Sequence, residues 1–545
     1  NGVFCGTIYN VTGDMRNKKL QVWLPLLFSL VMIAGMFFGF KLHQQTGSAK
    51  GYFVRDRRSS LQEALDLIKN KYVDTVKIDS LQDNAMEGIM NQLDPHSVYI
   101  PATDLSEANE DIVGNFQGIG VEFNIFEDTV NILYVVPNGP SDKAGLLIGD
   151  RIIKVGDSSI VSKILPSSDI RKMIRGEAGT AVDLTIVRNN KVQHKIVTRG
   201  NIPIPSLDAE YMLDATTGYI KLNKFAETTY QEFMRAMEDL QGKGMKSLVL
   251  DVRGNGGGLV TQATNIADEF LDGDKLIVYT QGSNTERREY KASKEGVFEK
   301  GKLVLLIDEL SASATEILAG ALQDWDRATI VGRRSFGKGL VQEQYGLSDG
   351  SAIRLTVSRY YTPAGRSIQR PYDKGKKIYM EEIMDRYKNG QLVNADSIHQ
   401  NLSKAYKTKG GRTVYGGGGI MPDVFVPIDT SIYTQSITKL YLDGRFNNFV
   451  YTYYFNHLKE FQQYKNPADF ASRYQNSADA WSQLVAYAKK DSVNLTNIPA
   501  MDKAEVQDRI KAYLARLKWR TQGFYEVSNA LDKVVQKAKE VIAKG

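Results

Sequence analysis

The sequence predicts an α/β protein of several domains, with an apolar segment near its N-terminus and a helical tail. Between about residues 205 and 427, apolar runs typical of strands alternate with amphipathic helical patterns, which indicates layered α/β architecture. The chain has 545 residues. Because single cores stop growing near roughly 250–300 residues, we expect more than one domain.

The composition is that of an ordinary globular protein. Apolar residues make up 42% of the chain and charged residues 24%, and the net charge of +6 is spread out, which gives little support to nucleic-acid binding. The single cysteine, Cys5, excludes a disulfide within one chain and a cysteine-based metal site. The five histidines are scattered and none belongs to an H-E-x-x-H pattern, so we expect no metal.

A transmembrane segment is predicted near the N-terminus. The run Val22–Phe40 has 19 residues without a charge. As a helix rising about 1.5 Å per residue it nearly spans a ~30 Å hydrocarbon core. The basic segment Arg16–Lys19 precedes it, as in a cytoplasmic flank, but basic residues also follow it, so charge alone does not orient it. No small-x-small cleavage pattern follows, which favours an uncleaved signal anchor over a removed signal peptide. Met15, just before the basic segment, is expected to be the natural start.

Residues 55–112 are expected to form a short helical region. Ser59 and Ser60 are suited to cap a helix with one apolar face, and L-D-P-H-S (Leu93–Ser97) ends the region. We interpret His96 as a local structural residue, because nothing around it in the sequence forms a site.

A different unit follows over residues 113–200. It opens with F-Q-G-I-G-V-E-F and contains A-G-L-x-x-G-D-x-I within Ala144–Ile153, and a strand pair around a turn at Asn189-Asn190 is expected to close it. This unit resembles a PDZ domain of the permuted bacterial kind. The resemblance implies that the N–H groups of Gly118, Ile119 and Gly120 form a nest for a peptide carboxylate, and that the next strand accepts the peptide by β-augmentation. The alternative is that these glycines only make a tight turn.

Residues 201–427 are expected to form the α/β core. Its apolar runs and helical patterns alternate along the chain, as in the layered architecture above. The expected strands are Gly218–Leu222, Ser247–Val252, Leu303–Ile307, Thr329–Val331 and Ala352–Val357, and the expected helices are Thr229–Gln241, Thr261–Phe270 and Ala314–Trp325, after Ser168–Arg175 in the preceding unit.

The glycine-rich segment D-V-R-G-N-G-G-G (Asp251–Gly258) directly follows an expected strand and opens a helix. Its glycines allow backbone N–H groups to converge near a helix N-terminus, which suits a developing oxyanion. Taken alone, the run also fits many phosphate-binding loops.

Residues 307–345 contain the predicted catalytic pair. Ser313 lies in a small-residue turn before a helix, and Lys338 lies between two glycines after the next strand. We predict a serine nucleophile with a lysine general base. The only histidine of the core, His399, lies in a polar segment, whereas burial lowers the pKa of a lysine and makes its free amine available. Gln342 both donates and accepts hydrogen bonds and is suited to orient that amine.

Two alternatives explain parts of this pattern. G-R-R-S-F-G-K (Gly332–Lys338) fits a nucleotide-binding P-loop, but such a loop requires Ser or Thr next and then a helix, whereas Gly339 and a strand-like run follow. S-A-T-E (Ser313–Glu316) is a capping box, so Ser313 alone is explained as a helix cap. The lysine, the glutamine and the glycine loop fall in the same α/β unit, which favours the catalytic interpretation.

Four motifs carry a resemblance to a known family. They are S-A-S-A-T-E-I-L-A-G-A-L (Ser311–Leu322), S-F-G-K-G-L-V-Q (Ser335–Gln342), Y-T-P-A-G-R-S-I (Tyr361–Ile368) and G-G-G-G-I-M-P-D-V (Gly416–Val424). With them, roughly from Ser59 to Pro427, the chain resembles the carboxyl-terminal processing peptidases, also called tail-specific proteases.

This resemblance implies a ClpP/crotonase-like protease core with a PDZ domain inserted ahead of it. It implies a Ser–Lys dyad with the nucleophile at Ser313, the base at Lys338 and a supporting glutamine at Gln342. Its oxyanion hole would consist of the Ala314 N–H and one N–H of the pair Gly257–Gly258, without fixing which glycine. The family's usual S-A-S-A-S-E has threonine at position 315 here, while the nucleophilic serine is retained.

The family motifs stop at about residue 428. Residues 428–545 have helical periodicity, with apolar residues from Leu531 to Ile542 along one face and aromatic residues close together over Tyr451–Phe455. We expect packed helices here. A dimerisation or partner-docking domain is the alternative.

Together these features predict a single-pass serine endopeptidase, anchored in the inner membrane of a Gram-negative-type bacterium, with its catalytic part in the periplasm. It would capture protein C-termini through the PDZ domain and cleave through an acyl-enzyme, with no metal or organic cofactor. The expected partners are proteins or peptides with accessible C-termini and the membrane, and a homo-oligomer is left open. The alternative function is a catalytically silent scaffold that only binds peptides. The predicted parts are residues 1–45, 55–112, 113–200, 201–427 and 428–545.

Overall fold

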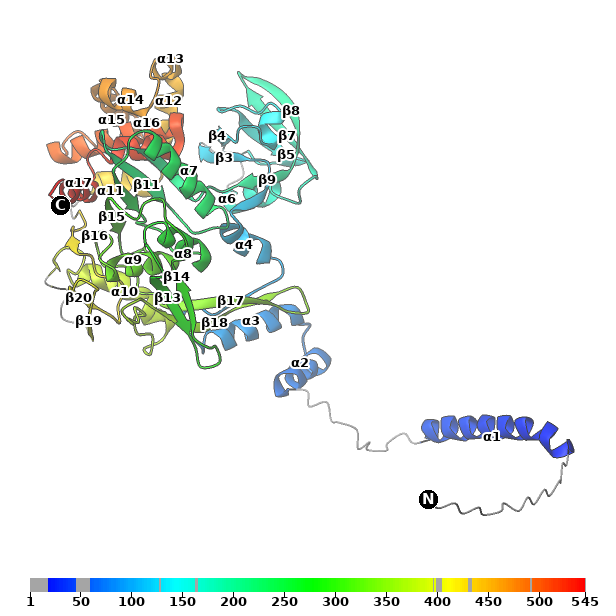
Figure 1. The fold of residues 1–545 in the computed structure, drawn as a ribbon. Coiled ribbons are helices and arrows are strands. Elements are labelled where there is room, and N and C mark those ends of the chain that lie inside the picture. The colour runs from blue at the N-terminus through cyan, green and yellow to red at the C-terminus, as the bar shows by residue number, and fades with distance from the viewer. Residues whose placement is uncertain are drawn as a thin grey trace, which may run out of the picture. The chain divides into compact units, whose positions relative to one another are not determined.

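The computed structural model divides the chain into two compact units, residues 1–82 and 83–545. The first contains α1 (Lys18–Gln45), α2 (Ser60–Lys71) and the start of α3 (Ile78–Met90) (Figure 1). The predicted cap of α2 is confirmed, because the Ser59 side chain accepts the Gln62 N–H at 3.3 Å. The structure describes residues 18–45, 59–126, 129–161, 165–395, 397, 404–429, 434–490 and 493–544.

The predicted membrane span lies within α1. The span ends at Val22 and Phe40, whose side chains the structure does not describe. Met15 lies outside the described residues. The described apolar side chains of α1 are exposed, and Phe28 is 67% exposed. Counting described residues only, no helix reaches the length and hydropathy needed to cross a membrane. The span therefore stays a prediction.

The second unit is built on a six-stranded sheet. Strand β10 runs antiparallel to β11, and the other neighbours are parallel. Four strands agree with the predicted ranges to within one residue at each end. In spatial order the sheet contains β10 (Leu207–Met212), β11 (Thr217–Leu222), β12 (Ser247–Asp251), β15 (Lys302–Ile307), β16 (Thr329–Gly332) and β21 (Val424–Phe425).

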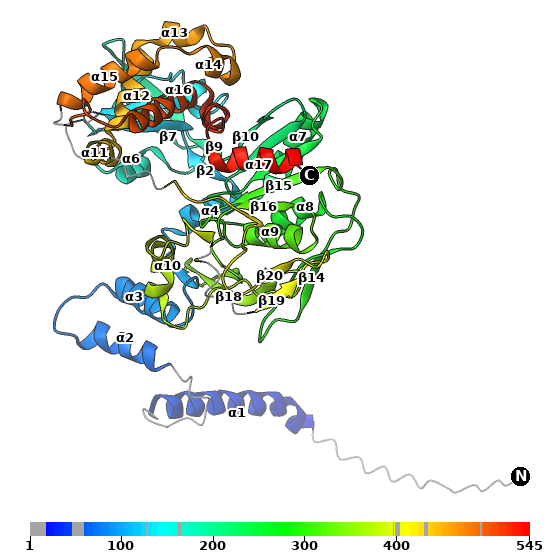
Figure 2. The ribbon, with the colours of Figure 1, turned by 90° about the vertical axis from the view of Figure 1, so that its left-hand side faces the viewer.

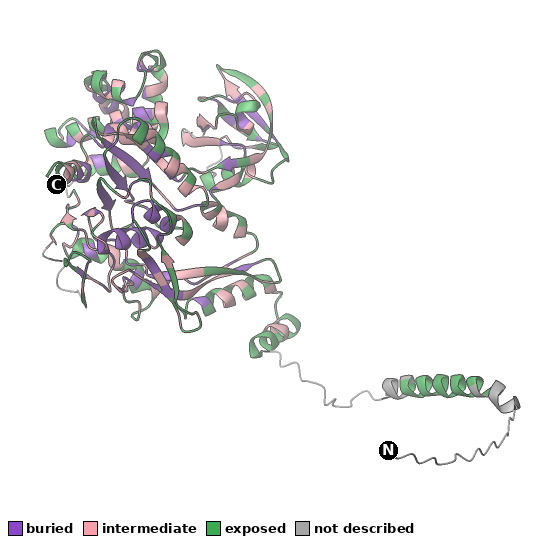
Figure 3. Ribbon diagram, viewed as in Figure 1, coloured by how far each residue is buried: buried purple, intermediate pink, exposed green. Residues whose placement is uncertain are grey.

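Helices cover both faces of this sheet. Alternate side chains along a strand point to opposite faces, so neighbouring residues of β12 belong to different apolar clusters. Leu248 and Leu250 belong to the apolar cluster of three helices, whereas Val249 belongs to that of the C-terminal helix. Figure 2 shows that last helix lying along β15 and β16, and Figure 3 shows the burial of the central strands and of α9. The covering helices are α7 (Thr229–Gly242), α8 (Val260–Asp268) and α9 (Ala314–Asp324) on one face and α17 (Lys533–Lys544) on the other.

A second sheet of five strands packs against α8 and α9. The strand predicted over 352–357 is longer than expected and ends at residue 361, because it pairs with three other strands. The run after Lys338 is a strand, as predicted, and not the helix that a P-loop requires. The sheet consists of β1 (Val98–Ile100), β13 (Leu276–Gln281), β14 (Arg288–Lys291), β17 (Leu340–Gly346) and β18 (Ala352–Tyr361).

The unit predicted as a PDZ domain forms its own sheet, in the order β3-β4-β5-β7-β8 with β6 beside β5. The turn between β7 and β8 has positive φ at Asn189 (51°) and Asn190 (59°), as a two-residue hairpin requires. Its elements are β2 (Asn115–Gly118), β3 (Val121–Phe126), β4 (Thr129–Val135), α5 (Pro140–Lys143), β5 (Arg151–Val155), β6 (Ser158–Ser159), α6 (Ser167–Ile174), β7 (Ala181–Arg188), β8 (Lys191–Thr198) and β9 (Gly200–Pro203).

The tail is helical, as predicted, but it divides in two. Helices α11 to α16 share one apolar cluster, whereas the apolar face of α17 packs on the core sheet. The prediction that Leu531 lies on that face was wrong: it is 61% exposed and precedes the helix. The other helices are α4 (Leu105–Val113), α10 (Lys376–Lys388), α11 (Gln435–Leu442), α12 (Arg445–Asn456), α13 (Leu458–Gln462), α14 (Pro467–Arg473), α15 (Ser477–Lys490) and α16 (Ala500–Ser528), and β19 (Ala405–Lys407) pairs with β20 (Thr413–Tyr415).

Candidate active site

Three loops meet at one edge of the parallel sheet. The glycine loop (residues 252–258) follows β12, the nucleophile loop (308–313) follows β15, and the lysine loop (333–339) follows β16. Since β12 pairs with β15 and β15 pairs with β16, the three loops are neighbours in space. Ligand sites of α/β proteins commonly lie outside the carboxyl ends of their strands.

Ser313 has an unusual backbone. It lies immediately before α9 with φ 56° and ψ −117°, a combination that a residue with a Cβ rarely adopts. Such conformations persist only where the surrounding structure enforces them, and they cluster at functional sites. The serine is half-buried, so its hydroxyl group lies at the edge of the core.

The two glycines beside Lys338 are both required by the geometry of the lysine loop. Gly337 has φ 91°, and a Cβ on Gly339 would lie 2.9 Å from the Gln369 nitrogen. The Lys338 amine donates to Gln342 Oε1 at 2.8 Å, as expected for an orienting glutamine.

Burial lowers the pKa of the Lys338 amine, and the positive charge of Arg354 lowers it further. The carboxylates of Asp94 and Glu316 act in the opposite direction. The net direction is the one that a lysine general base needs, because only the neutral amine accepts a proton.

The segments of Ser313 and Lys338 are held side by side. One oxygen of Glu316, Oε2, accepts the Ser313 N–H at 2.9 Å and the Lys338 N–H at 2.8 Å. The buried Tyr360 hydroxyl lies 3.1 Å from the Ser313 carbonyl oxygen and 2.8 Å from that of Lys338. Within the described residues, no hydrogen bond joins Ser313 Oγ to Lys338 Nζ. Catalytic hydrogen bonds are often long in a substrate-free enzyme.

Glu316 has more contacts than a helix cap needs. Its other oxygen, Oε1, accepts the Gly337 N–H at 2.7 Å and the Ser335 hydroxyl at 2.5 Å. Burial raises the pKa of this carboxyl to about 7, although these hydrogen bonds act the other way. The capping-box pattern predicted the bond to Ser313 but not the contacts with the lysine loop.

His96 lies beside the candidate site, so the expectation that nothing around it forms a site was wrong, whereas its interpretation as a local structural residue stays a prediction. Gln342 Nε2 donates to the His96 carbonyl oxygen, and His96 Nε2 lies 2.9 Å from the Tyr379 hydroxyl. Burial and then the positive charge of Lys338 lower the pKa of the His96 ring to about 4. No sequence signal indicates this contact, because 246 residues separate the glutamine from the histidine.

The glycine loop presents N–H groups beside Ser313. A Cβ on Gly257, where φ is 99°, would lie 2.8 Å from the Ser313 Cβ, so only glycine fits there. The Gly257 N–H donates to Asn255 Oδ1 at 2.9 Å. In the described part of the chain, the N–H groups of Gly258 and Ala314 donate to no other group.

In the PDZ-like unit, β3 lies at the edge of its sheet and is free to pair with another strand. A cavity of about 380 Å³ lies between β3 and α6, and Ile119 and Gly120 contribute to its wall. The N–H groups of these two residues have no acceptor among the described residues, whereas Gly118 pairs with Gly200 in the ladder of β2 and β9.

Among the described residues, no group of three or more His, Cys, Asp or Glu side chains is placed to hold a metal ion. His399 lies outside the described residues.

Four family models match parts of the chain. They describe peptidase family S41 (residues 216–374), a PDZ domain (132–188), the N-terminal domain of the activating protease CtpB (33–103) and a family of unknown function (436–520).

Known proteases are similar over most of their length. A carboxy-terminal-processing protease of Bartonella bacilliformis is 34% identical over 342 residues, covering 62% of this chain and 78% of the relative. The carboxy-terminal processing protease CtpA of Bacillus subtilis is 32% identical over 343 residues, covering 63% and 72%. Among solved structures, the photosystem II D1 C-terminal processing protease is 26% identical with a TM-score of 0.35, covering 68% of this chain and 86% of that chain.

Proposed function

Because the chain belongs to the carboxy-terminal processing proteases of peptidase family S41, and is therefore a serine-type peptidase with a PDZ domain, we propose that it is an endopeptidase with a Ser313–Lys338 dyad. The observation that carries the proposal is the joint anchoring of these two residues. Glu316 and Tyr360 each contact the backbone of both, and Gln342 holds the lysine amine.

In the proposed reaction, the neutral Lys338 amine takes the proton from Ser313 Oγ while this oxygen attacks the scissile carbonyl carbon. The negative charge on the carbonyl oxygen is stabilised by backbone N–H groups. When the intermediate collapses, the peptide C–N bond breaks and the lysine returns the proton to the leaving amine. A water molecule, deprotonated by the same lysine, then attacks the acyl carbon. The ester bond to Ser313 Oγ breaks, the lysine returns the proton to this oxygen, and the acid product leaves.

For the oxyanion hole we propose the N–H groups of Gly258 and Ala314. Gly258 ends the glycine loop and Ala314 is the first residue of α9, directly after Ser313, and neither N–H donates to another group in the described structure. Gly257 is the weaker candidate, because its N–H already donates to Asn255. Its proposed role is steric, since a side chain at that position would displace the nucleophile loop.

For substrate capture we propose that the C-terminal segment of a protein adds as a strand to the edge of β3. The unpaired N–H groups of Ile119 and Gly120 support a carboxylate site at the end of this groove, with Gly118 acting through the turn. Converting a substrate's terminal carboxylate to an amide should then raise KM. An unchanged KM would remove the carboxylate site from the proposal.

For location we propose a single-pass anchor in the inner membrane with the catalytic part in the periplasm. The uncharged run Val22–Phe40 and its basic N-terminal flank support this. The expressed chain should sediment with membranes, resist an alkaline wash and be digested by a protease added to the periplasmic side. Release by the wash would contradict the anchor. We also propose that the core has the ClpP/crotonase-like fold, supported by its parallel sheet with helices on both faces.

The test of function is cleavage of an unstructured protein followed on a gel. Wild type should cleave it, Ser313→Ala and Lys338→Ala should not, and Ser472→Ala, in α14, is the control for a distant serine. Binding of the substrate without cleavage by wild type would instead support the alternative of a silent peptide-binding scaffold.

A further inference from the structure

The glycine loop after β12 is connected to the last helix of the chain. Asp251 ends β12, and its carboxylate contacts the Arg253 guanidinium at 2.6 Å. The same guanidinium donates from Nη1 to Asp532 Oδ2 at 2.9 Å. Asp532 lies just before α17, which packs on the core sheet. One arginine therefore joins the glycine loop to a residue 279 positions later in the sequence.

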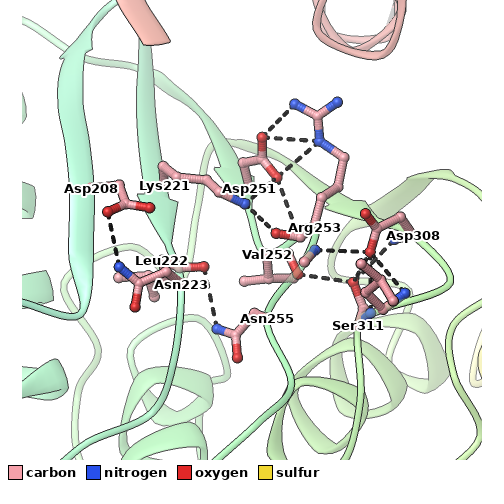
Figure 4. A network of polar contacts seen from close by, with 12 residues as sticks. Asp208, Lys221, Leu222, Asn223, Asp251, Val252, Arg253, Asn255, Asp308 and Ser311 are labelled. Carbon is pink, nitrogen blue, oxygen red and sulfur yellow. Dashed lines mark hydrogen bonds and ion pairs between the residues drawn. The ribbon is translucent and has the colours of Figure 1, made fainter. Parts of the chain in front are cut away.

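These charges are shielded from water. Asp251 is wholly buried, and the side chains of Arg253 and Asp532 are 16% and 27% exposed. Lys221 lies 3.3 Å from Asp251, so two cations balance two carboxylates (Figure 4 shows all but Asp532). Burial opposes ionisation of Asp251, but Arg253 and then Lys221 outweigh it and hold the pKa of its carboxyl well below the usual range. Asp251 keeps both of its cationic partners when Asp532 alone is changed, so neutralising the partly exposed Asp532 leaves no buried carboxylate unpaired.

On its other side the glycine loop is bound to the nucleophile loop. The Gly254 N–H donates to Asp308 Oδ1 at 2.8 Å, and the Ser311 hydroxyl donates to the Val252 carbonyl at 2.8 Å (Figure 4). The loop is therefore attached to the segment that carries Ser313 and, through Arg253, to the C-terminal segment. It is also bonded to residues 221–225, because Asn255 donates to the Leu222 carbonyl and the Gly257 carbonyl accepts the Phe225 N–H.

We propose that Asp532 is a positioning residue for catalysis: through Arg253 it fixes the glycine loop in the orientation that presents the Gly258 N–H to the developing oxyanion. The inference rests on the proposed function of that loop. Asp532 lies beyond all four ranges that the family models match, the last of which ends at residue 520. The tail of this chain thus supplies a part of the catalytic support that the matched protease core does not contain.

Asp532 also caps α17, and the test separates this role from the contact with Arg253. Asp532 Oδ1 accepts the N–H groups of Val534 (2.8 Å) and Val535 (3.1 Å). Asparagine caps a helix about as well as aspartate does. Asp532→Asn therefore keeps the cap through its amide oxygen but presents an NH₂ group to the guanidinium. Glu540→Gln removes a carboxylate from the exposed side of the same helix, where it pairs with a lysine, and is the matched control.

The full-length protein and both variants are compared on a peptide substrate. Losing a whole oxyanion donor costs about 10²–10³ in kcat, so a displaced donor in Asp532→Asn should lower kcat by about tenfold with KM and Tm unchanged. Affinity for a peptide boronate, which forms a tetrahedral adduct with the serine, should fall by the same factor. Glu540→Gln should match wild type in every measurement. An unchanged kcat in Asp532→Asn, or a loss that appears equally in KM and Tm, overturns the proposal.

Hydrogen–deuterium exchange supplies a readout that does not need activity. Residues 252–258 should exchange faster in Asp532→Asn than in wild type, while the N–H groups of α17 stay protected. Unchanged exchange in this loop overturns the proposal whatever the kinetics show. Failure of the proposed function would look different: wild type itself would be inactive, or Ser313→Ala would be active, and the loop would still respond to Asp532→Asn.

Discussion

Replacing Glu316 with glutamine tests whether one buried carboxylate holds the nucleophile and the lysine loops together. The carboxylate accepts four hydrogen bonds, two at each oxygen, from Ser313, Lys338, Gly337 and Ser335. Glutamine has nearly the same shape but only one acceptor oxygen, and its NH₂ group would face two of these donors. The substitution therefore leaves two buried donors without an acceptor.

The size of the effect follows from that count. A buried donor without a partner costs about 1–3 kcal/mol, so two cost about 2–6 kcal/mol. A typical domain has a total stability of about 5–15 kcal/mol, so the loss should be a large fraction of it. The distance between Ser313 and Lys338 should also become less well defined, because both N–H groups bind the same oxygen. We expect kcat/KM to fall more steeply than it does in a variant of equal stability loss elsewhere in the core.

The assay combines urea unfolding with peptide cleavage, at about pH 8, above the Glu316 pKa of about 7, so that the wild-type carboxyl is ionised. Glu343→Gln, which makes the same chemical change on the exposed side of β17, is the control and should behave as wild type. If Glu316→Gln unfolds at the wild-type urea concentration and cleaves at the wild-type rate, the reasoning about this carboxylate is refuted.

Three further predictions concern the same site. The proposed general base Lys338 must act as a neutral amine, and its pKa is lowered, so kcat/KM should be lost as the pH falls through that pKa and rise above it; a flat pH–rate profile would exclude the lysine as base. Gly257→Ala should be inactive, since its Cβ would lie 2.7 Å from the Ala312 carbonyl oxygen, whereas Gly256→Ala has open space and should cleave normally. Tyr360→Phe should lower the free energy of unfolding by about 1–3 kcal/mol, measured in urea, because the Lys338 carbonyl oxygen loses its donor, while the Ser313 carbonyl keeps the N–H groups of Glu316 and Ile317. An unchanged unfolding midpoint would contradict that role.

Much of the core could be predicted because its strands are buried on both faces. The segment 303–307 is apolar throughout, as parallel strands between two helical layers are, and its ends are marked by Gly301 and Asp308. The Asn189-Asn190 turn was equally readable, because few residues other than asparagine and glycine accept positive φ. In both cases the residue types within the segment itself determine its conformation.

Contacts between distant segments were not readable in this way. The Gln342 amide binds the carbonyl of His96, and a backbone carbonyl has no sequence signature. Whether Gly257 or Gly258 has a free N–H depends on the side chain of Asn255, which is invisible in a run of glycines. The periodicity of the tail predicted helix α17, but periodicity identifies an apolar face and not the surface that covers it.

The position of the site follows from the order of the parallel strands. The glycine, nucleophile and lysine loops each leave the carboxyl end of a strand, and β12, β15 and β16 are neighbours in that order. Ser313 therefore lies between the glycine loop on one side and Lys338 on the other, which is the arrangement that the proposed acyl transfer needs. A parallel sheet in which β16 lay elsewhere would contain the same residues but keep Lys338 away from Ser313, so the strand order is as necessary to the proposed chemistry as the side chains are.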